Sequence, residues 1–210
     1  MRRMSDGRWL SPALRDRVAA TIREIEGRTG AEVVVTVRAR SGYYRAADYL
    51  FGAVCSFAAL LGYVFLPITF PDDVAALLIV LSFGVGAVFA ANVPPLRRLL
   101  VSRSRRGEEV ARAARACFVE QGIGRTRDRT GVLVYLSLFE RRVEVVADGG
   151  IPVARLGQRY RDASAALDRA ARRRPEAFLS ALGALGELLA EAVPRRADDV
   201  NELPDEVVSG

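Results

Sequence analysis

Apolar residues recur every three or four positions near the start of the chain, and this spacing predicts an amphipathic helix. Ser11 followed by Pro12 predicts where the helix begins, because a hydroxyl side chain caps the first turn and proline suits its first position. Positions 32–38 are β-branched for the most part and predict a strand. The apolar face of the helix carries Leu14, Val18, Ile22 and Ile25.

Two long uncharged runs, 49–70 and 74–93, predict a pair of membrane-spanning helices. The first run has 22 positions. As a helix it would be about 33 Å long, the thickness of a bilayer core. Pro71, Asp72 and Asp73 separate the runs. A pair of buried core helices is the alternative, but it would need more soluble protein around it than the chain offers.

Arginines flank this hairpin on its outer sides, and the short connection between the runs contains two aspartates and no base. Because cytoplasmic loops carry an excess of arginine, this asymmetry predicts two spans with both termini in the cytoplasm. We therefore expect a multi-pass protein of the cell inner membrane. The flanking arginines are Arg38, Arg40 and Arg45 before the first run, and Arg97, Arg98, Arg103, Arg105 and Arg106 after the second.

A second polar region follows the hairpin and has its own alternation of elements. Val110, Ala114, Cys117 and Phe118 predict one more helical face. The run 132–138 is apolar on both faces, which is typical of a central strand covered on both sides. A turn at 139–141, a strand at 142–147 and two helices complete the pattern, and the second helix is anchored by Phe178, Leu182, Leu185 and Leu189.

Neither polar region can cover its own strands, because a single strand or a lone hairpin is marginal in water. Joining both regions into one sheet with helices on its faces solves the problem for each. The sequence therefore predicts an α/β fold, a three-layer α/β/α sandwich around a small sheet with an inserted two-helix transmembrane hairpin. The expected division is 1–48 and 97–193 for the two parts of the soluble domain, 49–96 for the hairpin, and 194–210 for a flexible acidic tail.

Composition limits the chemistry open to this chain. All 31 basic residues are arginine and there is no histidine, which removes P-loops, Schiff-base lysines and histidine-based triads. Cys55 and Cys117 are too few for a zinc site and are expected to be small packing residues. The net charge of +6 does not indicate nucleic acid, because acids are interspersed among the arginines outside the membrane flanks.

Three carboxylates form the candidate metal site: Glu32, Asp128 and Asp148. Asp148 ends the second strand of the hairpin in the stretch Ala-Asp-Gly-Gly, where it could hold calcium or magnesium or could simply turn the chain. Glu32 opens the first strand, and pairing with a neighbouring arginine is its alternative role.

The stretch "RTRDRT" at 125–130 supplies a candidate anion-binding group of Arg125, Arg127 and Arg129, since guanidinium forks suit phosphate or anionic lipid. A solvated loop is the alternative interpretation.

The segments "RTGAEVVVTV" (28–37), "FVEQGIGRTRDRTGVLVYLSLFERRVEVVADGGI" (118–151) and "DDVNELPDEV" (198–207) resemble the TPM-domain family, in particular its bacterial membrane-anchored members. The resemblance implies an α/β/α sandwich around a small sheet. It places Glu32 at the family's Gly-Glu position. Activities described in the family include acid-phosphatase-like reactions, calcium binding, and assembly or repair roles at membranes.

Two functional hypotheses follow from these observations. The first is a membrane-anchored TPM-type domain that acts as a non-enzymatic interaction or assembly module on the cytoplasmic face. Its partners would be the lipid bilayer and a membrane protein, without nucleic acid. The second is a metal-assisted phosphatase of the TPM type that uses Glu32, Asp148 and Asp128. A small transporter or channel subunit is a weaker third class, because neither predicted span contains a charge.

Overall fold

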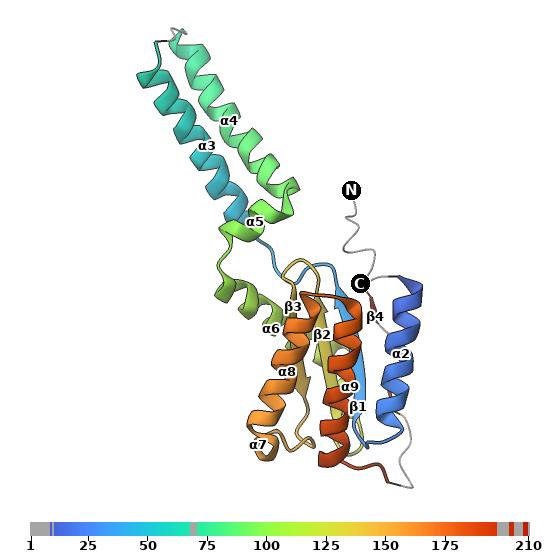
Figure 1. Cartoon of the computed structure of the whole chain (residues 1–210). Helices are drawn as coiled ribbons and strands as arrows, with labels where there is room; N and C mark the ends of the chain where they lie inside the picture. The colour runs from blue at the N-terminus through green and yellow to red at the C-terminus, as the bar shows by residue number, and fades with distance from the viewer. Residues whose placement is uncertain (1–8, 10, 68–70, 197–201, 204–207, 210) are drawn as a thin grey trace. The chain divides into compact units, whose positions relative to one another are not determined.

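The computed structural model describes the chain except residues 1–8, 10, 68–70, 197–201, 204–207 and 210. It divides into two compact units (Figure 1). Unit 1 contains Met1–Ser41 and Gly107–Gly210, and unit 2 contains Gly42–Arg106. The elements are α2 (Pro12–Glu26), β1 (Glu32–Arg38), α3 (Arg45–Phe65), α4 (Asp72–Asn92), α5 (Pro94–Leu100), α6 (Arg103–Glu120), η1 (Ile123–Arg125), β2 (Gly131–Ser137), β3 (Arg142–Ala147), α7 (Val153–Leu156), α8 (Gln158–Ala171), α9 (Pro175–Ala192) and β4 (Val208–Ser209).

Unit 1 is built on a sheet with the strand order β3-β2-β1-β4. β1 and β2 are parallel, with Glu32 opposite Gly131 and Arg38 opposite Ser137. β2 and β3 form an antiparallel hairpin. The prediction that the two polar regions of the chain share one sheet is confirmed, and the parallel pairing of β1 with β2 joins them.

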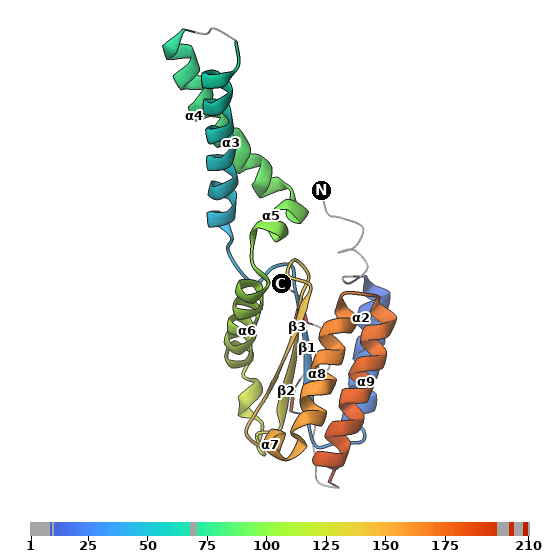
Figure 2. The same cartoon turned by 60° about the vertical axis from the view of Figure 1, so that its left-hand side comes forward.

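One face of this sheet is apolar and is covered by α2, α8 and α9 (Figure 2). The alternate residues of β1 and β2 on this face are valines and a leucine, and all are buried. Helix α9 supplies Phe178, the largest fully buried side chain among the described residues, and the fully buried Leu182. Gly186 lets α2 approach α9 closely, since a Cβ atom there would lie 2.3 Å from Cγ1 of Ile25.

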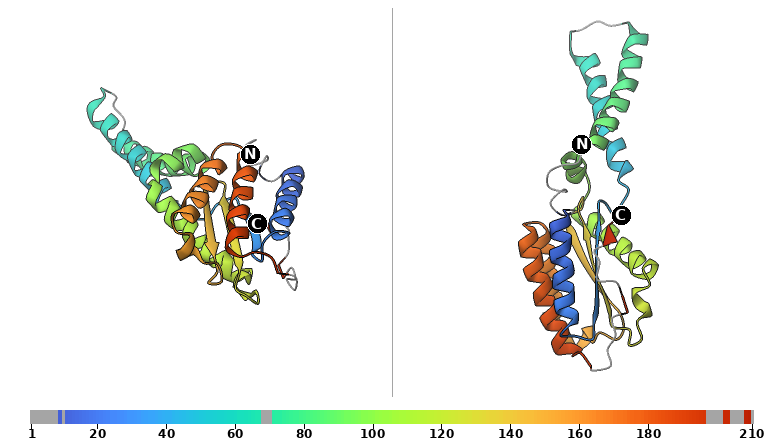
Figure 3. Two further views of the ribbon diagram at one scale, coloured as in Figure 1. Left: turned by 60° about the horizontal axis from the view of Figure 1, so that its bottom comes forward. Right: turned by 90° about the vertical axis from the view of Figure 1, so that its right-hand side faces the viewer.

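The opposite face is covered by the part of α6 that belongs to unit 1, as Figure 3 shows from the side. Its apolar cluster is smaller and includes Val34, Leu133 and Val110. Polar residues share this face: Thr36 is fully buried, and its hydroxyl group lies 3.2 Å from Nε2 of Gln121. The two faces of the sheet therefore differ in polarity as well as in the number of helices that cover them.

Both edges of the β1–β3 part of the sheet are capped by a carboxylate from a neighbouring helix. Oε1 of Glu26, at the end of α2, accepts a hydrogen bond of 3.0 Å from the N–H of Val33 in β1. Oδ1 of Asp168 in α8 accepts one of 3.0 Å from the N–H of Val143 in β3. Unpaired edge N–H groups are templates for association with other chains, and these two carboxylates occupy them.

The C-terminal region contributes to the sheet. Within the segment 194–210, which the sequence predicts to be a flexible tail, Val208 and Ser209 form β4 and pair with Thr36 and Val37 of β1. Leu203 packs on the apolar cluster beneath α6. Residues 197–201, 204–207 and 210 of this segment lie outside the described part.

Unit 2 contains two helices that are long and apolar enough to cross a membrane, α3 and α4. The two helices pack closely at glycines: a Cβ atom at Gly52 would lie 2.7 Å from the carbonyl oxygen of Phe83, and one at Gly86 would lie 2.8 Å from Sγ of Cys55. The hydroxyl group of Ser56 donates to the carbonyl oxygen of Ile79 at 2.9 Å. Small residues and interhelical hydrogen bonds are typical of helix pairs in lipid.

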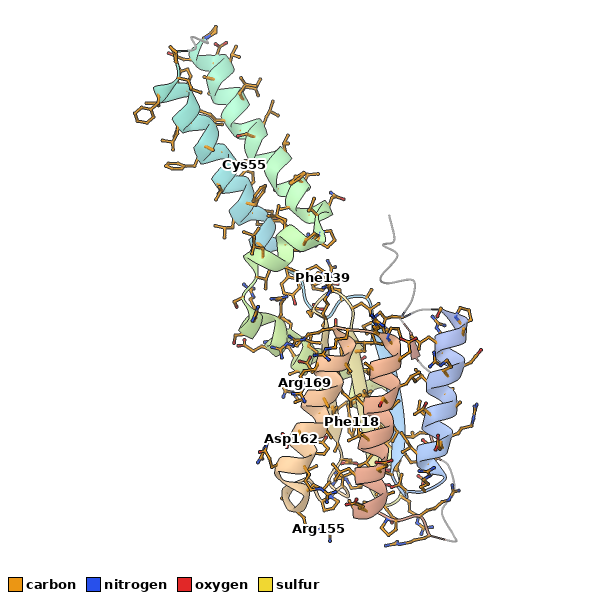
Figure 4. The ribbon with its side chains drawn as sticks, viewed as in Figure 1. Cys55, Phe118, Phe139, Arg155, Asp162 and Arg169 are labelled. Atoms are coloured by element: carbon orange, nitrogen blue, oxygen red, sulfur yellow. The ribbon has the colours of Figure 1, made fainter. Side chains whose placement is uncertain are left out.

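Most apolar side chains of α3 and α4 point away from the helix pair (Figure 4). Among them Phe65 is 78% exposed and Val85 is 69% exposed. The helix boundaries differ from those of the predicted runs. Helix α3 begins at Arg45 and ends at Phe65, whereas the run was 49–70. Helix α4 begins at Asp72 and ends at Asn92, whereas the run was 74–93, and Pro94 opens a separate short helix, α5. Aspartates suit a helix N-terminus, because they complement its dipole.

We predict that the Glu26 cap stabilises unit 1 at its β1 edge. Glu26→Ala should lower the free energy of unfolding by about 1–3 kcal/mol, because a buried N–H loses its acceptor. Glu26→Gln keeps an acceptor oxygen and should cost less. Chemical denaturation of the detergent-solubilised protein, followed by circular dichroism, measures both values. Equal stability of Glu26→Ala and the parent would contradict a role for this cap.

Candidate functional site

Two loops meet at the edge of the sheet where β1 and β2 begin and β3 ends. The backbone N–H of Asp148 donates to the carbonyl oxygen of Gly131 at 2.9 Å, and that of Gly150 donates to the carbonyl oxygen of Arg129 at 2.8 Å. A Cβ atom at Gly150 would lie 2.2 Å from the carbonyl oxygen of Asp128. Glycine at 150 is therefore required by close approach of the two loops.

The carboxylate of Asp148 is buried and is held by donors from both loops. Its Oδ1 accepts from Nη2 of Arg129 at 2.7 Å and from the N–H of Gly149 at 2.7 Å. Its Oδ2 lies 3.4 Å from Nε of Arg129. Arg129 has a backbone φ of 56°, in the left-handed region that costs energy for residues other than glycine. Asp148 thus turns the chain and fixes a strained arginine, and its charge is balanced by that arginine.

The structure does not bring the three candidate carboxylates together as a metal site. Glu32 is buried, and its Oε2 lies 3.4 Å from the N–H of Leu203. Asp128 is partly exposed and pairs with Arg196 at 3.5 Å and with Arg127 at 3.9 Å. Among the residues that the structure describes, no group of three or more acids, cysteines or histidines is arranged to hold a metal ion. The carboxylates have separate protein partners.

The three candidate anion-binding arginines also have different surroundings. Arg129 holds Asp148. Arg127 lies beside Asp128, and its backbone N–H donates to Oε2 of Glu202 at 2.9 Å. Arg125 ends η1, and its side chain lies against Gly122, where a Cβ atom would be 3.4 Å from its Cδ. The contacts of these arginines build the loop itself.

A cleft of about 480 Å³ lies beside these loops and was not identified in the sequence. It is lined by backbone near Gly30 and Gly150 and by three arginines, Arg155, Arg195 and Arg196. Arg155, labelled in Figure 4, belongs to α7, and its Nη2 donates to the carbonyl oxygen of Ala192 at 3.3 Å. Arg195 and Arg196 lie in the segment that the sequence predicts to be flexible. The spacing of residues in the sequence therefore did not indicate that they would line a cleft with Arg155.

A second polar cluster lies at the opposite edge, where β1 and β2 end. Glu140 is buried and accepts from the N–H of Ser41 at 3.1 Å and from the hydroxyl group of Ser137. The hydroxyl oxygen of Ser41 is 3.2 Å from that of Tyr135. Burial raises the pKa of Tyr135 above its usual range, partly offset by the hydrogen bond with Ser41. The cluster joins the β2–β3 turn to the segment after β1.

Glu144 in β3 is an acid of the α6 face whose charged form is disfavoured by burial. Burial raises its pKa, and the nearby Arg115 and Arg142 oppose that shift. A carboxyl group with a raised pKa in the folded state contributes stability that is present at low pH and is lost as pH rises through that value. At neutral pH the partly buried carboxylate of Glu144 therefore lowers the stability of the fold, because its charged form loses hydration.

Comparisons with known proteins concern the fold. No family model matches the chain, and no curated protein matches it. Among solved structures, the chain is similar to the NMR structure of the BA42 protein from the psychrophilic bacterium Bizionia argentinensis, with a TM-score of 0.60 and 15% identity. The match covers 100% of each chain. At this identity the likeness shows a shared fold and nothing about activity.

We predict that Asp148 acts mainly by accepting hydrogen bonds that hold the turn. Asp148→Asn keeps an acceptor for the N–H of Gly149 and should be well tolerated, whereas Asp148→Ala should lower the free energy of unfolding by about 1–3 kcal/mol. Denaturant titrations of the two variants beside the parent measure this difference. Calorimetry with calcium should show no binding that depends on Asp148. Micromolar calcium binding by the parent that is lost in Asp148→Asn would contradict this account.

Proposed function

We propose that this chain is a two-span protein of the bacterial inner membrane whose unit 1 is an interaction or assembly module of the TPM type on the cytoplasmic face. In this proposal unit 1 is a three-layer α/β/α sandwich, and α3 and α4 form a transmembrane hairpin inserted between its two chain segments. The module binds another membrane protein and performs no catalysis.

The observation that carries the proposal is the exposed apolar surface of α3 and α4. A helix in a soluble core buries its apolar side chains, whereas only 11% and 17% of the most apolar stretches of α3 and α4 are buried. Each helix has 21 residues and is therefore about 31 Å long, which matches the hydrocarbon thickness of a bilayer. The arginines on the outer sides of the two helices support cytoplasmic termini.

An interaction role, in preference to catalysis, is supported by the way unit 1 uses its polar side chains. Asp148 is neutralised by Arg129, Glu26 and Asp168 cap strand edges, and Glu140 ties the β2–β3 turn to Ser41. Each of these carboxylates has a structural partner. No observation of comparable weight favours the metal-assisted phosphatase, whose three proposed acids hold separate partners.

Cysteine accessibility tests the topology. In a background with Cys55→Ala and Cys117→Ala, a cysteine replacing Asp73 in the first turn of α4 should react with a membrane-impermeant maleimide in intact cells. A cysteine replacing the exposed Asp162 of α8 should react only after the cells are permeabilised. Asp73 is chosen over its neighbour Asp72 because Asp72 accepts a hydrogen bond from the hydroxyl group of Tyr63 at 2.6 Å, and replacing Asp72 would remove that contact.

The two labelling patterns that contradict the proposal differ from each other. Reaction of the Asp162 position and protection of the Asp73 position in intact cells would reverse the orientation. Equal protection of both positions until permeabilisation would mean that α3 and α4 do not carry the connection across the membrane.

A further inference from the structure

We propose that one end of unit 2 is a binding site for the headgroups of anionic phospholipids, an inference that rests on the proposed membrane-spanning role of α3 and α4. This basic end is where α3 begins, α4 ends and α5 follows (Figure 1). It carries six arginines and one aspartate, while the other end of the helix pair carries two aspartates and no arginine. Its members are Arg45, Asp48, Arg97, Arg98, Arg103, Arg105 and Arg106.

The single acid of the basic end is fully engaged. Oδ1 of Asp48 accepts from Nε of Arg97 at 2.8 Å, and Oδ2 accepts from Nη2 of the same guanidinium at 2.6 Å. Both side chains are nearly buried, with exposed fractions of 8% and 12%. This bidentate pair fixes α5 to α3 and uses both carboxylate oxygens. By sequence, the basic end therefore has five more arginines than acids.

Helix α5 has the composition of an interfacial helix. Its seven residues are two prolines at the start, three leucines and two arginines, and Leu99 is 82% exposed. Such a leucine, next to arginines and seven residues beyond the end of α4, suits the boundary between headgroups and acyl chains. Because Arg97 is held by Asp48, the position of α5 against α3 is fixed and Leu99 is presented outward.

The start of α6 adds a reason for an anion at this place. Its first turn contains Arg103, Arg105 and Arg106 and no acid. Cations at a helix N-terminus oppose the helix dipole, and an anion placed there relieves both effects. The Nε–H of Arg106 is buried and has no hydrogen-bond acceptor within the described part of the chain. Glu108 and Glu109 follow farther along the helix, and Glu109 accepts from Arg112 at 3.2 Å.

A phospholipid fits these features better than a soluble anion does. Arg45 begins α3 and the other arginines follow α4 in α5 and α6, with the exposed Leu99 between them in the sequence. A ligand that offers both a negative headgroup and an acyl chain suits this combination. Arginine binds phosphate oxygens in a bidentate manner, which favours a phosphodiester or phosphomonoester headgroup. Each arginine near an anionic membrane surface strengthens binding about fivefold.

Native mass spectrometry of the full chain, purified in a neutral detergent, tests this inference with phosphatidylglycerol and phosphatidylcholine of identical acyl chains. The parent should bind phosphatidylglycerol about tenfold more tightly or better. The triple variant Arg103→Gln, Arg105→Gln, Arg106→Gln should lose most of this preference. A matched triple variant removes the same charge from exposed arginines of unit 1, Arg161→Gln, Arg169→Gln and Arg173→Gln, and should keep it.

Two outcomes would overturn the inference. One is equal affinity of the parent for the two lipids, and the other is an equal loss of preference in both triple variants, which would indicate a general charge effect. Circular dichroism of each variant verifies that a loss of binding is not a loss of fold. Failure of the proposed function would be seen separately, in the labelling of the Asp73 and Asp162 positions, which does not depend on the lipid headgroup.

Discussion

The parallel pairing of β1 with β2 is the interaction on which the rest of unit 1 depends. β1 is buried along almost its whole length and cannot be covered by the 41 residues that precede unit 2. β2 has the same requirement, and its seven residues are all buried. Register between them brings Val33 and Val35 beside Val132 and Val134, which builds one continuous apolar face. Helices from both chain segments then cover that face.

Carboxylates accept hydrogen bonds from backbone N–H groups that the paired strands leave without a backbone partner. Glu26 and Asp168 occupy edge N–H groups, and Asp148 closes the loops at the start of the parallel strands. Burial of such groups is costly unless each has a partner, and each of these three has one. This use of acids explains why a chain with 25 acidic residues lacks a convergent acidic site among its described residues. The acids stabilise backbone that would otherwise be unpaired.

The periodicity of apolar residues predicted most helices and strands of this fold, but it did not predict which polar residues come together. Strand β1 was predicted with its observed bounds, and Val134 and Leu136 were correctly placed on a buried central strand, because runs of β-branched and apolar residues have few other solutions. The short helices α5 and α7 were missed, since four to seven residues carry too little periodicity. The pairing of β4 with β1 was not predicted either, since β4 contributes only two residues.

The candidate site was less predictable, because it depends on which loops meet. The turn function of Asp148 could be inferred from the glycines that follow it, but its pairing with Arg129 could not, since nothing in the spacing of 19 residues requires that contact. The cleft lined by Arg155, Arg195 and Arg196 brings together residues from α7 and from the segment after α9. Such groupings arise from tertiary structure, and no local pattern records them.

Hydrogen–deuterium exchange of the full chain in detergent tests most directly whether β1 and β2 form one cooperative sheet across two chain segments. Backbone amides in β1 should exchange as slowly as those in β2, because strands of one cooperative unit open together. The same slow exchange should extend to α9, which packs on both strands. Rapid exchange throughout β1, with β2 and β3 still protected, would contradict the account.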